Sequence, residues 1–161
     1  MDISRPTLGV RLMSGSMTTT IRAMAFGDAE QVAALAGELG YPSTRSQIEA
    51  RFRGIEGNDD SRVLVAADSD GRVWGWVHVF GHHLIESEGQ AEVGGLIVDS
   101  RARGAGIGTS LMAAAEAWAR ERGYTRLTLR SNTIRTEAHR FYQDLGYAIV
   151  KSQHKFQKPL R

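Results

Sequence analysis

The chain has 161 residues, of which 42% are hydrophobic and 24% charged, and its formal net charge is +2. These values predict one globular domain with a sizeable core, and the apolar runs are too short for the ~18 residues that a membrane span needs. The lack of cysteine excludes disulfides, thiolate metal sites and a cysteinyl intermediate, and a cytoplasmic location is expected.

The first part of the chain divides into a tail and the start of a fold. Residues 1–18 are rich in Ser, Gly, Thr and Met without periodicity, so we expect a flexible tail followed by a single domain over 19–161. Asp28 with Gln31 predicts a capping box at the start of a helix. A second helix is expected after Tyr41-Pro42-Ser43.

The rest of the chain alternates between strand and helix patterns. The Asp70-Gly71 step suits a tight hairpin turn between two apolar runs. A buried stripe at helical spacing follows the third run and ends at Gly123, which suits a helix C-cap. The expected strands lie over 62–67, 73–80, 91–98 and 126–130, the later helices over about 107–122 and 138–145, and two closing strands over 147–150 and 154–160.

A glycine-rich turn joins the third strand to its helix. It consists of Arg103, Gly104, Ala105, Gly106, Ile107, Gly108 and Thr109. Alternating glycines allow a sharp bend in which amide N–H groups point at phosphate oxygens where a helix begins. The dinucleotide fingerprint does not fit, because its third glycine would fall on Thr109, and a P-loop would need a lysine. An ordinary strand-to-helix connection is the alternative.

Arg-x-x-Gly-x-Gly after a strand resembles the motif with which the GNAT family, the Gcn5-related N-acetyltransferases, holds the pyrophosphate of acetyl-CoA. A second signature follows in family order: Asn132 closes a strand and precedes an Ala-x-x-Phe-Tyr-x-x-x-Gly-Tyr run over 138–147. The resemblance covers about residues 92–147. It implies an α/β (α+β) fold with a mixed, mainly antiparallel sheet of six or seven strands, flanked by four helices and splayed between strands 4 and 5.

The resemblance also implies how acetyl-CoA is held. Gly94-Gly95 within an apolar strand predicts a bulge, which either opens the sheet for the pantetheine arm or merely bends it. The backbone of Leu96, Ile97 and Val98 should bind the acetyl and pantetheine groups. Residues 103–109 should bind the pyrophosphate, and Asn132 with Tyr142 should lie beside the pantetheine and the sulfur.

The chemistry requires a base, because a primary amine with a pKa of ~10.4 is mostly protonated at neutral pH. Glu92 is the first candidate: its spacing to Arg103 matches that of the catalytic glutamate in family members that act on histones. It also lies four residues before Leu96, which predicts the same strand face. His78 is the rival base. Tyr142 occupies the family's tyrosine position and should protonate the CoA thiolate, and the Leu96 amide should stabilise the oxyanion.

The implied activity is acetyl transfer from acetyl-CoA to a primary amine of a small molecule or peptide, by direct attack in a ternary complex. A non-catalytic acyl-CoA sensor is the alternative, and scattered rather than clustered basic residues argue against nucleic-acid binding. No metal is expected, because His78 and His82 lie roughly 13 Å apart on a strand. Tyr41-Pro42-Ser43 and the 80–91 loop with Glu86 and Glu88 should line the acceptor site. A homodimer is plausible.

Overall fold

The computed structural model describes residues 8–11 and 18–161, and the chain falls into two compact units. The first unit extends to Leu129 and holds the sheet, and the second comprises Arg130–Arg161. No helix in the described part of the chain combines the length and the apolar character that crossing a bilayer requires.

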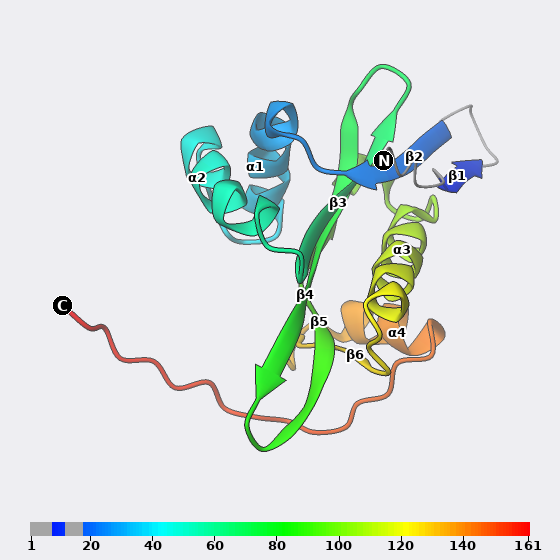
Figure 1. Ribbon diagram of the computed structural model, residues 1–161. Helices are drawn as coiled ribbons and strands as arrows, with labels where there is room; N and C mark the ends of the chain where they lie inside the picture. The colour runs from blue at the N-terminus through cyan, green and yellow to red at the C-terminus, as the bar shows by residue number, and fades with distance from the viewer. Residues whose placement is uncertain (1–7, 12–17) are drawn as a thin grey trace. The chain divides into compact units, whose positions relative to one another are not determined.

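The first unit is built on one mixed sheet whose strands follow one another in chain order (Figure 1). Neighbouring strands are antiparallel except for the last pair, which is parallel. This arrangement confirms the expected mixed, mainly antiparallel α/β class. The strands within the described residues are β1 (Leu8–Arg11), β2 (Thr18–Ala23), β3 (Ser61–Asp68), β4 (Val73–Leu84), β5 (Ser87–Val98) and β6 (Leu127–Leu129).

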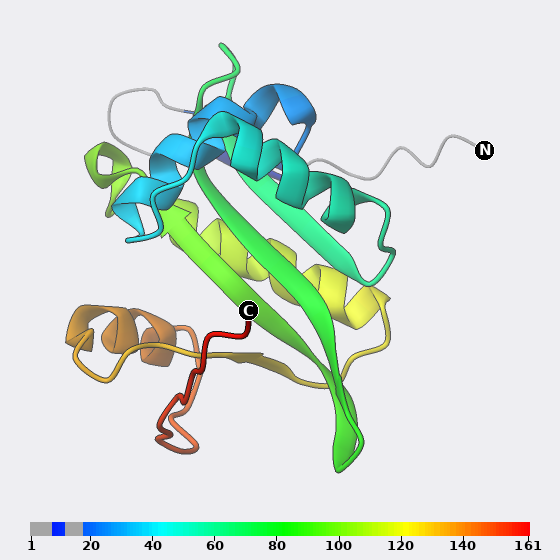
Figure 2. The ribbon, with the colours of Figure 1, turned by 90° about the vertical axis from the view of Figure 1, so that its left-hand side faces the viewer.

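Helices cover both faces of this sheet. Helices α1 and α2 lie on one face and α3 on the other, as the two views show (Figures 1 and 2). A fourth helix belongs to the second unit. The described helices are the short 3₁₀ turns η1 (Phe26–Asp28) and η2 (Ser100–Ala102), and α1 (Ala29–Glu38), α2 (Arg45–Glu56), α3 (Ile107–Glu121) and α4 (Thr136–Asp144).

The alternation of side chains along β4 divides the core between these two layers. Val77 and Val79 are fully buried on the α3 face. Their neighbour Gly75 has no room for a Cβ, because the Ile97 carbonyl would lie 2.8 Å from it and the Leu111 side chain 3.1 Å. The intervening residues of β4, with Trp76 among them, face α1 and α2. The first unit therefore has three layers, with the sheet between α3 and the α1–α2 pair. The side of β4 that faces α3 is buried, whereas Trp76, His78 and Phe80 on the other side are half-buried.

The helix starts differ in part from the sequence-based expectation. The capping box predicted at Asp28 and Gln31 is wrong, because the Asp28 carboxylate turns back to Arg22 and to the Ala25 amide at 2.8 Å. Gln31 instead accepts a hydrogen bond from the Val73 amide, at 2.8 Å. An ion pair with Arg22 and a hydrogen bond from Val73 thus take the place of the local cap at the start of α1.

The two ends of the chain also differ from the expectation. Within the segment expected as a tail, Leu8–Arg11 forms β1, and its remaining residues up to position 17 lie outside the described part. The predicted closing strands are wrong: residues 147–161 have no regular structure, and Val150 is 86% exposed. A strand-like composition needs a neighbouring strand and a buried face to form a strand, and none of the described strands pairs with these residues.

Candidate active site

Strand β5 contains the bulge that the glycine pair predicted. His78 of β4 pairs with Gly95 and Val79 pairs with Val93, so Gly94 is the extra residue. A Cβ on Gly94 would lie 3.0 Å from the Phe80 ring. Glycine is therefore suited to this position because the neighbouring aromatic side chain approaches the backbone closely.

Beyond this bulge one edge of β5 has no ladder partner among the described strands. Strand β6 pairs only with Ala91–Val93. The Asp99 amide donates to the Trp74 carbonyl at 2.7 Å, which makes that rung a hydrogen-bonded pair of the β4–β5 ladder. Since such pairs alternate along an antiparallel ladder, Leu96 and Val98 direct their N–H and C=O groups away from β4, toward the open edge.

The glycine-rich turn follows directly, and its amide groups are available. Gly104 and Gly106 both have φ of +82°, and Gly106 is the N-cap of α3. No hydrogen bond recorded among the described residues is donated by an amide of residues 103–109. The first amide after this segment, that of Ser110, donates to the Gly106 carbonyl. A helix N-terminus with unused donors is an anion site by its electrostatics.

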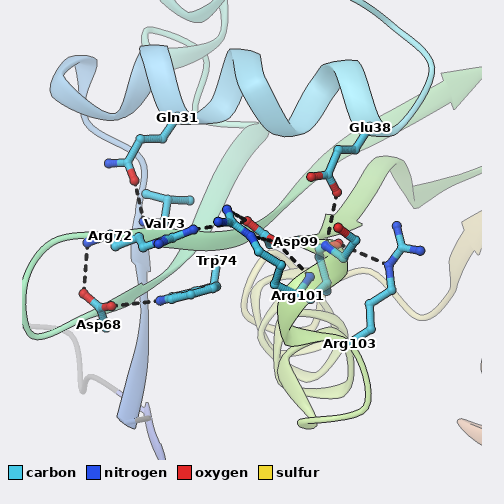
Figure 3. Close-up of polar contacts among 11 residues, drawn as sticks. Gln31, Glu38, Asp68, Arg72, Val73, Trp74, Asp99, Arg101 and Arg103 are labelled. Carbon is cyan, nitrogen blue, oxygen red and sulfur yellow. Dashed lines mark hydrogen bonds and ion pairs between the residues drawn. The ribbon is translucent and has the colours of Figure 1, made fainter.

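A buried carboxylate fixes the segment that enters this turn (Figure 3). Asp99 lies at the N-cap of η2 and accepts from the Arg101 amide at 2.9 Å and from its guanidinium at 3.0 and 2.8 Å. These hydrogen bonds hold the pKa of Asp99 down to about 2. The guanidinium of Arg72 lies 3.7 Å from the same carboxylate and stacks over Trp74, 4.0 Å from the ring centroid.

Two more contacts hold the same segment from its sides. The Glu38 carboxylate at the end of α1 accepts from the Ser100 amide at 3.1 Å, and Arg103 Nε approaches the outward-facing Val98 carbonyl at 3.4 Å (Figure 3). Sequence reasoning missed this set of contacts. The one local signal for these contacts is Asp99 itself, which ends a strand two residues before Arg101, because aspartate is a preferred N-cap residue.

Glu92 lies on the opposite face from the one expected. It pairs with Phe80 and therefore shares a face with His78, whereas Leu96 pairs with Val77 on the α3 face. The expectation that Glu92 and Leu96 share a face is wrong, because the extra residue at Gly94 changes the alternation. The Glu92 carboxylate is buried and lies 2.7 Å from Nδ1 of His82.

His78 faces a cavity of about 300 Å³ between α1, α2 and the sheet. Its Nε2 lies 2.9 Å from the Ser61 hydroxyl, and burial lowers the pKa of the imidazole. The bulge residues Gly94 and Gly95 line the same cavity. Of the expected acceptor loops, Tyr41 and Ser43 line it, whereas 81–90 contribute nothing because they extend β4 and β5 into a longer hairpin.

Asn132 and Tyr142 belong to the second unit. Tyr142 lies on α4 between two aromatic rings, with centroids 5.1 Å from Phe141 and 6.1 Å from Tyr147, and burial raises the pKa of its phenol. Asn132 is exposed, and its side chain accepts from the Ile134 amide at 3.2 Å. The helix expected around Tyr142 is confirmed.

Comparison with known proteins gives one consistent family. A sequence model of the Acetyltransferase (GNAT) family matches residues 29–147. Among curated proteins, an aminoglycoside N(6')-acetyltransferase type 1 from Stenotrophomonas maltophilia is 28% identical over 105 residues, which are 63% of this chain and 69% of the relative.

Solved structures share the fold over nearly their whole length. A protein described as a transcriptional regulator from Bacillus halodurans C-125 has a TM-score of 0.77 at 27% identity, covering 87% of this chain and 99% of its own. The aminoglycoside acetyltransferase AAC(6')-Iy was solved with the bisubstrate analog CoA-S-monomethyl-acetylneamine. Its TM-score is 0.78 at 20% identity, and the match covers 88% of this chain and 99% of that protein. At that lower identity the likeness concerns the fold.

Proposed function

The chain belongs to the GNAT family of acetyltransferases, and on this premise we propose that it transfers the acetyl group of acetyl-CoA, the donor used by this family, to a primary amine held in the same complex. The carrying observation is the open edge of β5 after Gly94, which continues into a turn with unused amides. An extended amide-containing arm fits an open strand edge, and a diphosphate fits the turn.

The donor is held by main-chain groups of β5 and the turn in this proposal. Leu96, Ile97 and Val98 bind the acetyl and pantetheine portion. The hydrogen bonds come from the backbone N–H and C=O groups of Leu96 and Val98, which face outward. Amides of Arg103–Thr109 bind the diphosphate, and Asn132 binds beside the pantetheine. Because Asp99 fixes the entry to the turn, these donors are held in place before the ligand arrives, which lowers the ordering cost of binding.

When bound, acetyl-CoA supplies an activated thioester carbonyl for attack by the amine. The Leu96 amide donates a hydrogen bond to the carbonyl oxygen as it gains charge. Tyr142 gives its proton to the sulfur as the carbon–sulfur bond breaks, and its raised pKa keeps the phenol protonated at neutral pH.

Before it can attack, the acceptor's ammonium group loses a proton to a side chain on the α1–α2 face of the sheet, because only the neutral amine has a free electron pair. His78 and Glu92 are the two candidates. The cavity favours His78, because this imidazole lines it beside the bulge and its lowered pKa keeps it neutral and able to accept a proton at pH 7. Glu92 stays a candidate through its position on the same face.

The Tyr142→Phe variant tests this function. We expect acetyl-CoA to bind with unchanged affinity in calorimetry while kcat falls about 100-fold, the lower range of general acid catalysis. His78→Ala and Glu92→Gln are compared by pH–rate profile, since loss of the base removes the acidic limb. Binding of acetyl-CoA without transfer to any amine of a broad panel would instead indicate a sensor, and full turnover by Tyr142→Phe would contradict its role.

A further inference from the structure

The cavity between the α1–α2 layer and the sheet has an apolar wall. Val32, Leu39, Ile48, Phe52, Val63 and Trp76 supply most of it, from both helices and both central strands. Its volume of about 300 Å³ corresponds to roughly ten water-sized groups. A small molecule of one ring or one branched chain fits this volume, whereas a molecule of several sugar rings would extend out of the cavity into solvent.

The charge of this cavity comes from one side chain. Arg51 of α2 is the one arginine or lysine among the lining residues, and no carboxylate lines the cavity. Its guanidinium donates to the Ser43 hydroxyl at 2.8 Å, and no ion pair of Arg51 is recorded among the described residues. An arginine without an acidic partner at the rim of an apolar cavity is suited to bind a carboxylate of a ligand.

The acidic residues that suggested a cationic acceptor lie elsewhere. Glu86 and Glu88 are exposed in and after the β4–β5 turn and do not line the cavity. Glu92 is turned to His82. A polycationic amine would therefore give up the hydration of several ammonium groups in this cavity without meeting a carboxylate, and it would be repelled by Arg51.

We propose that the acceptor is a small primary amine with an aromatic or branched aliphatic body and a single carboxylate, and that Arg51 selects for this carboxylate. The proposal rests on the acetyl-transfer function above. It separates this chain from the relatives named for aminoglycosides, because the lining residues of the cavity, rather than the shared fold, determine the acceptor.

The experiment compares amines that differ only in the carboxylate. 4-(Aminomethyl)benzoate is compared with benzylamine, and phenylalanine with phenethylamine, so that two separations of amine and carboxylate are tested. Kanamycin and spermidine represent the polycations. Release of CoA thiol is followed with a thiol reagent, which meets no background because the chain has no cysteine. Binding of each amine without acetyl-CoA is measured by calorimetry in parallel.

We expect at least one carboxylate-bearing amine to exceed its carboxylate-free partner by about tenfold in kcat/KM and in affinity, as for a charge-assisted hydrogen bond at a partly exposed site. Arg51→Gln should abolish that tenfold preference and leave benzylamine and phenethylamine within about twofold. Arg51→Glu should reverse it, favouring 1,4-bis(aminomethyl)benzene over 4-(aminomethyl)benzoate. Arg45→Gln, a charge removed from the same helix outside the cavity, serves as the matched control.

The outcomes separate this proposal from the proposed function. Preference of the native chain for kanamycin or spermidine, or for the carboxylate-free amines, overturns the acceptor class while leaving acetyl transfer intact. Acetyl-CoA binding without turnover of any amine overturns the function, and the calorimetric preference for the carboxylate, lost in Arg51→Gln, then decides whether the cavity binds this class. Equal effects of Arg51→Gln and Arg45→Gln would also overturn the role of Arg51.

Discussion

The two halves of β5 differ in what surrounds them. From Ala91 to Val93 the strand has ladder partners on both edges, β4 and β6, and these three residues are buried. From Gly94 to Val98 it pairs with β4 alone, and its outer edge leads into the glycine-rich turn. One extra residue at the bulge separates a half with strand partners on both edges from a half whose outer edge has no strand partner among the described residues.

The comparison teaches that an exposed edge can be maintained only because the rest of the strand is secured. Unpaired backbone groups invite misassembly, and proteins limit them in length or cover them. Here five residues form the open segment, and each end of it is fixed: Val93 by the last β6 rung and Asp99 by its arginines.

The largest effect on stability is expected from Val93→Ala in the doubly paired half. Val93 is 6% exposed, and removing its two methyl groups should lower the free energy of unfolding by about 2 kcal/mol. Acetyl-CoA affinity of the folded protein should stay unchanged. Urea unfolding and calorimetry measure the two quantities, with Leu96→Ala, at a half-buried position of the open half, as the comparison. An equal loss of affinity in Val93→Ala would remove the distinction between the halves.

A smaller effect, and one on binding, is expected from Gly104→Ala in the turn. Gly104 has φ of +82°, a backbone conformation that costs a residue with a side chain roughly 1–2 kcal/mol. The alanine variant should avoid this cost by changing the conformation of the turn. The affinity for acetyl-CoA should therefore fall about tenfold. Gly123→Ala at the other end of α3 is the matched control, with φ of +87° and equal open space. It should lower stability without changing affinity. Equal affinity losses in both variants would contradict the role of the turn.

The smallest effect is expected from Asp99→Asn, and it depends on pH. Because the pKa of Asp99 is depressed to about 2, its charge contributes stability above pH ~4 that is lost as the pH falls toward 2. The variant should be less stable at pH 7 by about 1 kcal/mol, a value reduced because Arg101 is 66% exposed. Urea unfolding between pH 7 and 2.5 should show the difference shrinking. The control is Asp59→Asn, which removes a carboxylate from an exposed turn between α2 and β3. A difference independent of pH, or one shared by this control, would exclude the Asp99 charge as its cause.

Much of the fold followed from local patterns. The Asp70-Gly71 hairpin, the stripe of α3 and the bulge at Gly94 are each confirmed, since each depends on a short segment and its own backbone chemistry. The capping box at Asp28 was wrong because Arg22, six residues earlier, competes for the carboxylate. Strand patterns after 146 were wrong because no local pattern supplies a pairing partner.

The candidate site was predictable to a similar degree. The sequence indicated the turn and the Leu96–Val98 segment as candidate binding elements because each is a contiguous motif, and their binding role stays a prediction. The face of Glu92 was not, because a single extra residue reverses the alternation of side chains. Arg51, His78 and Gly95 come from three separate elements, so only their packing into one cavity associates them.

The sequence alone indicated the family, the glycine-rich turn and the order of the elements from α1 to α4, because glycine spacing and apolar periodicity act over a few residues at a time. The tertiary structure alone decided which edge of β5 stays open, which face carries Glu92 and His78, and which charged side chain lines the cavity between α1, α2 and the sheet. Those features depend on ladder register and on side chains brought together from distant segments, and neither is encoded in any single stretch of the chain.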